Sequence, residues 1–214
     1  MTIRPIAVLL AASVICQAAI VDRIAIIIGN RIIKDSDIAE DLRITAFLNG
    51  EQPSFTAASR KKAASRLIDQ ALIRNEIEMG EYPTGSIAEA NNLLASLKKS
   101  RYASNAAYEK ALASYGISDE DVKSQLLWQL TVLKFIDLRF RPGAVATEEE
   151  IAKYFQEHQK ELQASKPAQA VTLENSRSQI QEQVAGERVN QLLDEWLGRR
   201  RENSKIVYLE EGLK

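Results

Sequence analysis

The sequence contains few of the residues on which many protein classes depend. It has one cysteine, one histidine, nine glycines and five prolines in 214 residues. Such a small number of turn-forming residues disfavours a sandwich or barrel of many short strands and favours helices. Cys16 lies in a segment that we expect to be removed, which would leave no thiol for disulfides, thiolate catalysis or soft-metal binding.

An excess of charge of one sign is also absent. Lys and Arg number 28 against 29 Asp and Glu, a net charge of -1, so nothing in the charge balance favours nucleic acid as a partner. The glycines are isolated, and none begins a strand-to-helix turn followed by lysine, so we expect no bound nucleotide. Hydrophobic residues make up 45% and charged residues 27%, which is ordinary for a chain that folds.

Residues suited to catalysis or metal binding are scarce. His158 is the only histidine, so no imidazole pair is available, and we interpret it as a partly exposed helix residue. The acidic run at 148–150 fits the first turn of a helix better than a cation site. Arg199, Arg200 and Arg201 are interpreted in the same way, as cations at the end of a helix. We therefore expect no metal, no cofactor and no enzymatic activity.

The first residues have the pattern of a cleavable signal peptide. Arg4 precedes an apolar run from Ile6 to Ile15, and the small residues Ala18 and Ala19 follow. The apolar run is shorter than the ~20 residues that span a bilayer. We assign residues 1–19 to the signal peptide and expect the mature protein in the periplasm of a bacterial envelope.

A small β-sheet is predicted at the start of the mature chain. Two β-branched runs, at 24–28 and 31–34, flank the turn signal Gly29-Asn30 and predict a hairpin. An isolated hairpin is marginally stable in water, so a third strand is needed, and residues 205–209 are the candidate.

The rest of the chain shows helical spacing with recognisable helix ends. Residues 126–140 are apolar on nearly every side, a pattern typical of a helix buried among others. In the second helix, Arg66, Asp69, Arg74 and Glu78 are predicted to face solvent. A polar stretch at 163–170 is predicted to be a linker. The expected helices run from Asp35 to about Asn49, Thr56 to about Met79, Ser86 to about Lys99, Ser104 to Tyr115, Ser118 to Phe140, Thr147 to Leu162 and Thr172 to about Arg200.

Several segments together resemble the SurA family of periplasmic chaperones. Residues 21–38 resemble the hairpin and first-helix start of that family, and residues 66–73 and 115–122 resemble its second helix and the start of its long helix. Residues 179–209, which include Trp196, are similar to its C-terminal helix and strand. The resemblance implies a mainly α fold, in which a helical chaperone core carries an N-terminal hairpin completed by a C-terminal helix and strand.

The sequence departs from this family at one place. In the SurA family, the helix that residues 147–162 resemble leads into a parvulin-type prolyl isomerase domain of about a hundred residues. In this sequence, only about ten residues lie between that helix and the last one. The expected organisation is therefore a core at 20–140, a helix and linker at 141–171 and a returning helix and strand at 172–214. The resemblance implies a chaperone that binds unfolded outer-membrane or secreted polypeptides without ATP and without isomerising them.

The aromatic residues supply the candidates for a peptide-binding groove, because exposed apolar patches bind extended chains. A module that binds one folded envelope partner is the alternative function, and a prolyl isomerase is a third. The sequence leaves open whether two chains exchange segments in a swapped dimer. The groove candidates are Phe47, Phe55, Tyr102, Tyr108 and Trp128.

Overall fold

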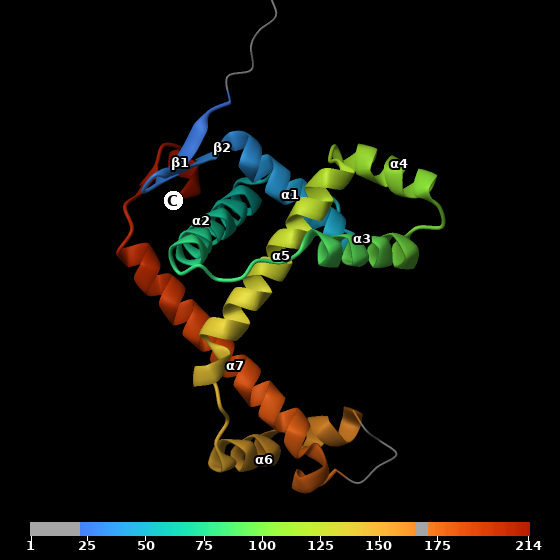
Figure 1. Cartoon of the computed structure of the whole chain (residues 1–214), viewed down its shortest axis with the longest axis vertical. Coiled ribbons are helices and arrows are strands. Elements are labelled where there is room, and N and C mark those ends of the chain that lie inside the picture. The colour runs from blue at the N-terminus through green and yellow to red at the C-terminus, as the bar shows by residue number, and fades with distance from the viewer. Residues whose placement is uncertain (1–21, 166–170) are drawn as a thin grey trace, which may run out of the picture.

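The computed structural model describes residues 22–165 and 171–214. The predicted signal peptide lies outside these residues, as does most of the predicted linker. Within the described ranges the protein is mainly helical, with one small sheet, as expected (Figure 1). The elements are β1 Ile24–Ile28, β2 Arg31–Lys34, α1 Asp35–Asn49, α2 Ala57–Met79, α3 Ile87–Arg101, α4 Asn105–Tyr115, α5 Asp119–Arg139, the 3-10 turn η1 Arg141–Gly143, α6 Glu148–Ser165, α7 Leu173–Glu202, β3 Ile206–Tyr208 and the 3-10 turn η2 Glu211–Leu213.

The sheet joins the two ends of the described chain. Its strand order is β2-β1-β3, and both pairings are antiparallel. The predicted hairpin and the predicted third strand are both present, with Ile27 opposite Ile32 on one side and opposite Val207 on the other. A C-terminal strand thus completes an N-terminal hairpin, which is the arrangement that a lone two-stranded ribbon needs for stability.

The helix ends follow the local rules on which they were predicted. Ser86, Ser118 and Thr172 each begin a helix with a reciprocal capping box, in which cap and third residue hydrogen-bond to each other's backbone. Gly50 and Gly116 end α1 and α4 with φ of 73° and 65°, a left-handed conformation that glycine adopts without a Cβ penalty.

The helices form a body and a foot (Figure 1). The sheet and α1 to α5 make the body, and α7 runs from the sheet past the end of α5 down to the foot. In the foot, α6 packs on the first half of α7, where Ile151, Leu162 and Ile180 are buried together. Arg188 on α7 ties the foot to its connecting segment by donating to the Val145 carbonyl at 2.8 Å.

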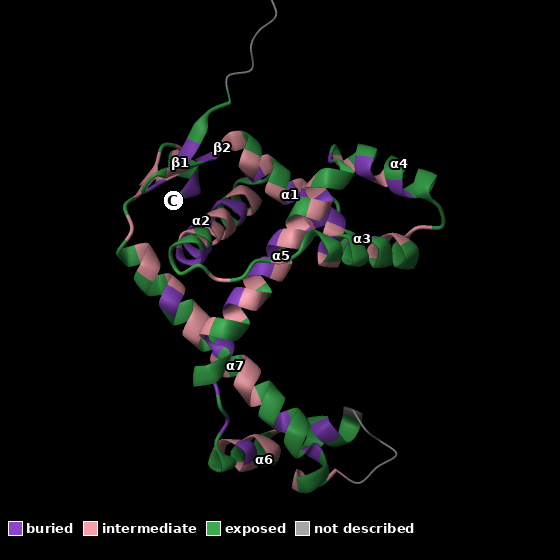
Figure 2. Cartoon of the chain, viewed as in Figure 1, coloured by how far each residue is buried: buried purple, intermediate pink, exposed green. Residues whose placement is uncertain are grey.

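Helix α2 connects two parts of the core. Ile68 and Leu72 pack with the sheet, while Ile73 and Ile77 pack with Phe135 and other residues of α5 and α7. The buried residues follow α2 and α5 through the body, and α4 and α6 expose most of their surface (Figure 2). The apolar side chains of the sheet and of α7 therefore belong to different clusters, and α2 joins them.

Three expectations need correction. Helix α6 continues to Ser165, so the first part of the predicted linker, at 163–165, is helical. Helix α5 is not enclosed, because Leu133 and Leu138 are 62% and 53% exposed. Arg66 and Asp69 do not face solvent freely, since both are half-buried in ion pairs with other helices.

Candidate functional site

The five predicted aromatic residues fall into three places. Phe47, Tyr102 and Tyr108 come together with Tyr115 between α1, α3 and α4. The ring centroids of Phe47 and Tyr115 are 5.4 Å apart, and those of Tyr102 and Tyr108 are 5.3 Å apart. Phe47 and Tyr108 are only 2% and 1% exposed. These two side chains are part of the core and cannot contact a bound chain unless the core rearranges.

Phe55 lies apart from this cluster, on the loop between α1 and α2. It is 46% exposed, and the guanidinium of Arg43 lies 5.8 Å from its ring centroid. Phe55 is thus accessible, but it stands as a single exposed aromatic side chain, a common feature of protein surfaces.

Trp128 is the predicted residue that borders cavities. A cavity of about 530 Å³ lies between β2, α1, α2 and α5, and Trp128, Arg74 and Ser124 are part of its wall. The same three residues also line a second cavity of about 430 Å³, which extends towards Thr84 and Thr131. The two cavities therefore share a wall at Trp128, and we call them together the Trp128 groove.

Arg74 covers the Trp128 ring in this groove. The guanidinium of Arg74 lies 3.8 Å from the centroid of the Trp128 ring, close enough for a cation–π interaction. Burial lowers the pKa of Arg74, and the nearby charge of Arg31 lowers it further. Arg31 is held in place by donating to Asn75 Oδ1 at 2.6 Å. A ligand that reached the Trp128 ring would have to displace Arg74.

Acidic side chains of α1 and α5 also line the Trp128 groove. Asp37, Glu40, Asp41 and Asp121 all line the larger cavity. Burial raises the pKa of Glu40, and the neighbouring carboxylates of Asp121 and Asp37 raise it further. Burial also raises the pKa of Asp41, although Arg66 pairs with it. The groove thus offers charge of both signs rather than a continuous apolar surface, and its Trp128 side chain is only 7% exposed.

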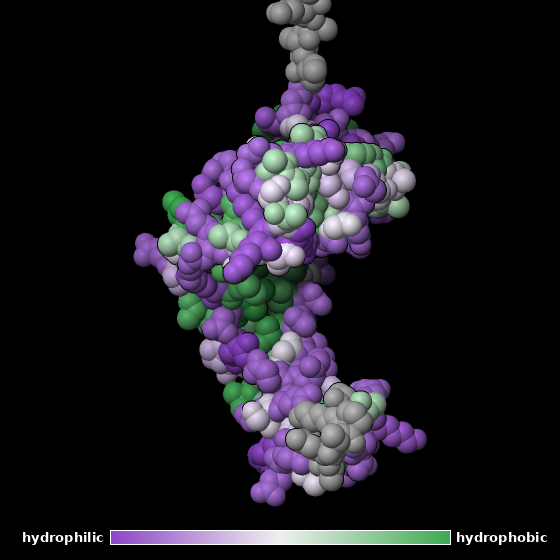
Figure 3. Space-filling model, turned by 90° about the vertical axis from the view of Figure 1, so that its right-hand side faces the viewer, coloured by the Kyte–Doolittle hydropathy of each residue, from purple (hydrophilic) through white to green (hydrophobic). Residues whose placement is uncertain are grey.

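A second surface, which was not predicted, combines apolar side chains with the charged Lys134, Asp137 and Arg141. Leu133 and Ile136 of α5 and Val189 of α7 line a shallow cavity of about 320 Å³ between the two helices. Arg141 borders it and pairs with Glu182 at 3.0 Å. Figure 3 shows hydrophobic surface gathered in the hollow between body and foot, at the height of the second half of α5. We call this surface the α5–α7 hollow.

The described residues contain no cluster of His, Cys, Asp and Glu suited to holding a metal ion. None of the helices described is long and apolar enough to cross a membrane. His158 stacks on Tyr154 at 4.2 Å between ring centroids, and its Nδ1 lies 2.9 Å from Glu161 Oε2 on the same helix. These contacts are local to α6 and lie in neither surface.

The sequence contained a signal for the α5–α7 hollow. Helix α5 is apolar on nearly every side, and such a helix must either be enclosed or leave apolar side chains in solvent. The many apolar residues of α5 therefore indicated that some of them would be exposed. Which side of α5 is exposed depends on how α7 and α3 pack against it.

Comparison with known proteins does not assign the chain to a family. No family model matches the sequence, and no curated protein matches it either. The function has to be argued from the two surfaces.

Proposed function

We propose that the protein is an ATP-independent chaperone that holds unfolded polypeptides, in particular precursors of outer-membrane proteins, in the bacterial envelope. The observation that carries this proposal is the α5–α7 hollow, where Leu133 is 62% exposed beside Ile136 and Val189. Val189 is 8% exposed and Ile136 is partly buried, so Leu133 is the most accessible apolar side chain of the hollow. Exposed apolar surface is typical of an interaction site. The resemblance of the sequence to SurA chaperones points to the same function.

The shape of the molecule suits this role. The hollow lies between body and foot, so a segment of unfolded chain in it would be flanked by both (Figure 3). Apolar contacts and main-chain hydrogen bonds hold extended chains with little sequence selectivity. Such binding is passive and reversible, so it needs neither nucleotide nor covalent chemistry.

The proposal is tested by measuring how the purified protein binds two forms of an outer-membrane protein. One form is unfolded in urea and then diluted, and the other is folded in detergent. Fluorescence anisotropy should show binding of the unfolded form alone. Leu133→Asp should weaken that binding by about tenfold or more, because burial of a leucine contributes about 1.5–3 kcal/mol. Met79→Asp is the matched control, since Met79 is 72% exposed and lines neither surface. Failure to bind the unfolded form would contradict the proposal.

A second candidate function is a module that binds one folded envelope protein. The Trp128 groove favours it, because fixed arginines and carboxylates around one aromatic ring recognise a defined surface better than a variable one. Binding of a single native protein, with no binding of unfolded chains, would support this alternative. A prolyl isomerase is the third candidate, and acceleration of prolyl isomerisation in a model peptide would support it.

A further inference from the structure

Strand β3 forms one edge of the sheet, and the backbone groups on its outer side are unpaired. Gly29 N donates to Lys205 O at 3.1 Å, and Leu209 N donates to Ala25 O at 2.8 Å. Backbone groups alternate in direction along a strand, so Val207 also faces β1 and pairs with Ile27. The N–H and C=O groups of Ile206 and Tyr208 therefore point away from the sheet.

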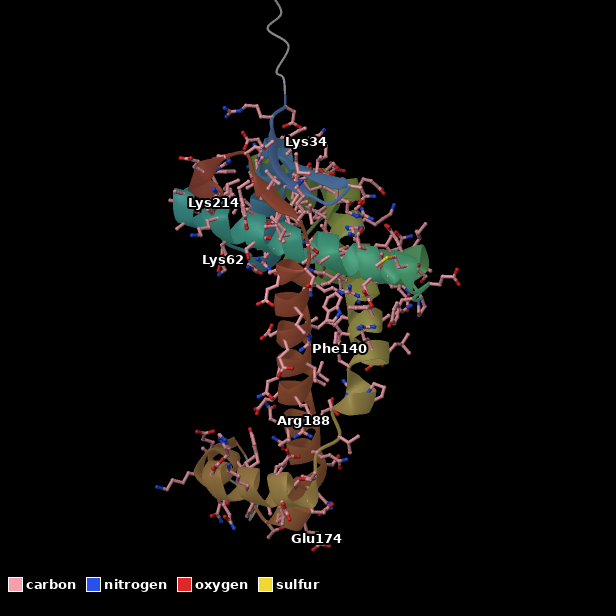
Figure 4. The ribbon with its side chains drawn as sticks, turned by 90° about the vertical axis from the view of Figure 1, so that its left-hand side faces the viewer. Lys34, Lys62, Phe140, Glu174, Arg188 and Lys214 are labelled. Atoms are coloured by element: carbon pink, nitrogen blue, oxygen red, sulfur yellow. The ribbon has the colours of Figure 1, made fainter. Side chains whose placement is uncertain are left out.

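No described element covers this edge. The sheet order places nothing beyond β3, and no hydrogen bond of the described chain satisfies the outward groups of Ile206 and Tyr208. Figure 4 looks onto this side of the molecule, and no helix or strand lies in front of β3. An open row of this kind is a template for pairing with another chain.

The other edge of the sheet is the more charged of the two. Strand β2 has charges at both ends, Arg31 and Lys34, and Asp37 accepts a hydrogen bond from the Lys34 N–H at 2.8 Å. Charged ends and an occupied donor protect an edge from further pairing. Strand β3 is Ile206-Val207-Tyr208, with no charge within it.

The outer face of the sheet is also apolar. The register places Ile32, Ile27 and Val207 in one row across the three strands. Ile32 is 48% exposed, and Leu209, on the same side as Val207, is 55% exposed. Ile206 and Tyr208 point the other way and pack on the core. A small antiparallel sheet with an apolar outer row and one open apolar edge is incomplete as a monomer surface.

We propose that β3 pairs with β3 of a second copy of this chain, antiparallel across a two-fold axis at Val207, to form a continuous six-stranded sheet. In this register, Ile206 of each copy faces Tyr208 of the other. Each of these pairs exchanges both backbone hydrogen bonds, so every outward group of the strand is satisfied.

The same register suits the side chains. The row Ile32, Ile27, Val207 continues into the corresponding row of the second copy, which gives one β-branched surface across the joined sheet. Lys205 lies beside Leu209 of the second copy, so its aliphatic stem covers an exposed leucine. The two Lys205 side chains lie towards opposite ends of the paired strands. In this register the outward groups of Ile206 and Tyr208 all find partners and Lys205 covers Leu209, so a second copy completes the edge without any other segment.

Proline at position 206 provides the test. Ile206→Pro removes an outward N–H while leaving the bonds between β3 and β1 in place, because the N–H of Val207 carries that ladder. Sedimentation equilibrium of the purified protein should show a concentration-dependent dimer, and Ile206→Pro should weaken it by about tenfold or more. Ile206→Ala, which keeps the N–H, is the control for lost side-chain packing and should retain dimerisation better. A monomer at all concentrations, or an unchanged dimer in a folded Ile206→Pro variant, would overturn the proposal.

Amide exchange of the unaltered protein gives an independent measurement. In the dimer, the amides of Ile206 and Tyr208 should be protected at high concentration and exchange quickly on dilution. The Val207 amide should be protected at both concentrations, because it bonds within the chain. Fast exchange at Ile206 and Tyr208 at every concentration would overturn the proposal even if the proline variant failed to fold. Because the proposal does not depend on chaperone activity, its outcome is separate from that of the client-binding test.

Discussion

Arg201 near the end of α7 donates from Nε to Oδ1 of Asp69 on α2 at 2.7 Å, although 132 residues separate them. Its Nη2 donates to the carbonyl and hydroxyl oxygens of Ser65, at 2.9 and 2.8 Å. The hydrogen bond that Arg201 donates to Asp69 raises the pKa of Arg201. Two turns further along α2, Glu76 pairs with both Arg200 and Arg139. These polar contacts hold the C-terminal end of α7 against α2.

Replacing Arg201 should therefore reduce the free energy of unfolding. We expect Arg201→Met to lower it by about 1–3 kcal/mol, because Asp69 and Ser65 lose hydrogen-bond partners in a half-buried place. Arg199→Met is the control, since the Arg199 side chain is 63% exposed and, among the residues that the structure describes, its one ion pair is with Glu195 at 3.6 Å. That change should stay within about 0.5 kcal/mol. Urea unfolding measures both, and equal losses would contradict the assigned role of Arg201.

Gly85 is the position where the connection between α2 and α3 passes closest to α5. A Cβ at Gly85 would lie 2.8 Å from the Leu130 Cβ and 3.0 Å from the Leu127 carbonyl oxygen. Gly85 N also donates to Thr131 Oγ1 at 2.9 Å, so the loop cannot easily move away. We expect Gly85→Ala to destabilise the protein by about 1–3 kcal/mol.

Gly198 is the matched control for this change. It lies inside α7 with nothing near the position of an added Cβ. Gly198→Ala should stabilise the protein by about 0.5–1 kcal/mol, because alanine favours the helix. The melting temperatures of the two variants should shift in opposite directions. An unchanged melting temperature for Gly85→Ala would show that Gly85 lies less close to α5 than the structure indicates.

Local features of the fold could be predicted from the sequence. The hairpin follows from two β-branched runs around Gly29-Asn30, and the helix starts follow from Ser86, Ser118 and Thr172. Turn and helix-capping patterns depend on residues only a few positions apart, so they can be recognised in the sequence without knowledge of the fold. The third strand was predicted for a different reason, since a lone hairpin needs a partner and residues 205–209 had suitable composition.

Long-range pairings could not be predicted in this way. Asp69 and Arg201 each looked like a charged residue on a helix surface, and their contact depends on how α7 crosses α2. For the same reason, aromatic residue type did not separate the buried Phe47 from the exposed Phe55. Trp128 was named as a groove residue, but its neighbours in the groove come from four elements and could not be assembled from spacing alone.

Glu89 gives the protein a dependence of stability on acid pH. Lys134 Nζ and the Ser86 N–H donate to Glu89 Oε2 at 2.9 and 2.8 Å. The bond from Lys134, followed by those from Ser86, lowers the pKa of Glu89 from 4.5 to about 2. A carboxyl whose pKa is lower in the folded state stabilises that state above its unfolded pKa. This stabilisation is lost as the pH falls from 4.5 to about 2.

Glu89→Gln should therefore lower stability near neutral pH and have progressively less effect across this acid range. Urea unfolding of both proteins over a pH series measures the difference. Lys134→Met should produce the same loss, and the double variant should lose little more than either single one. Because Glu89 is exposed, salt should weaken the effect. A difference that stays constant with pH would contradict the role of this ion pair.

The C-terminal segment is expected to stabilise the N-terminal helices. Trp196 packs with Phe135 and Phe140, at 5.6 and 6.1 Å between ring centroids, and β3 completes the sheet. Deleting residues 172–214 exposes both contacts and leaves a hairpin that is marginal by itself. We expect the truncated chain to lose its cooperative thermal transition by circular dichroism. A cooperative melt in the truncated chain would show that the N-terminal part folds independently.

A change at Leu213 tests, with a single side chain, whether the C-terminal segment stabilises the rest of the fold. It lies one residue from the C-terminus yet is 3% exposed, packed in the cluster of Ile26, Ala63 and Ile68. Glu210 beside it accepts from Arg60 at 3.0 Å, which holds the C-terminal turn against α2. Leu213→Ala should lower the free energy of unfolding by about 2–4 kcal/mol, because it removes a buried side chain and leaves a cavity. Leu209→Ala, at a position 55% exposed, should cost less than about 1 kcal/mol. Equal and small effects of the two changes would mean that the last turn does not contribute to the core.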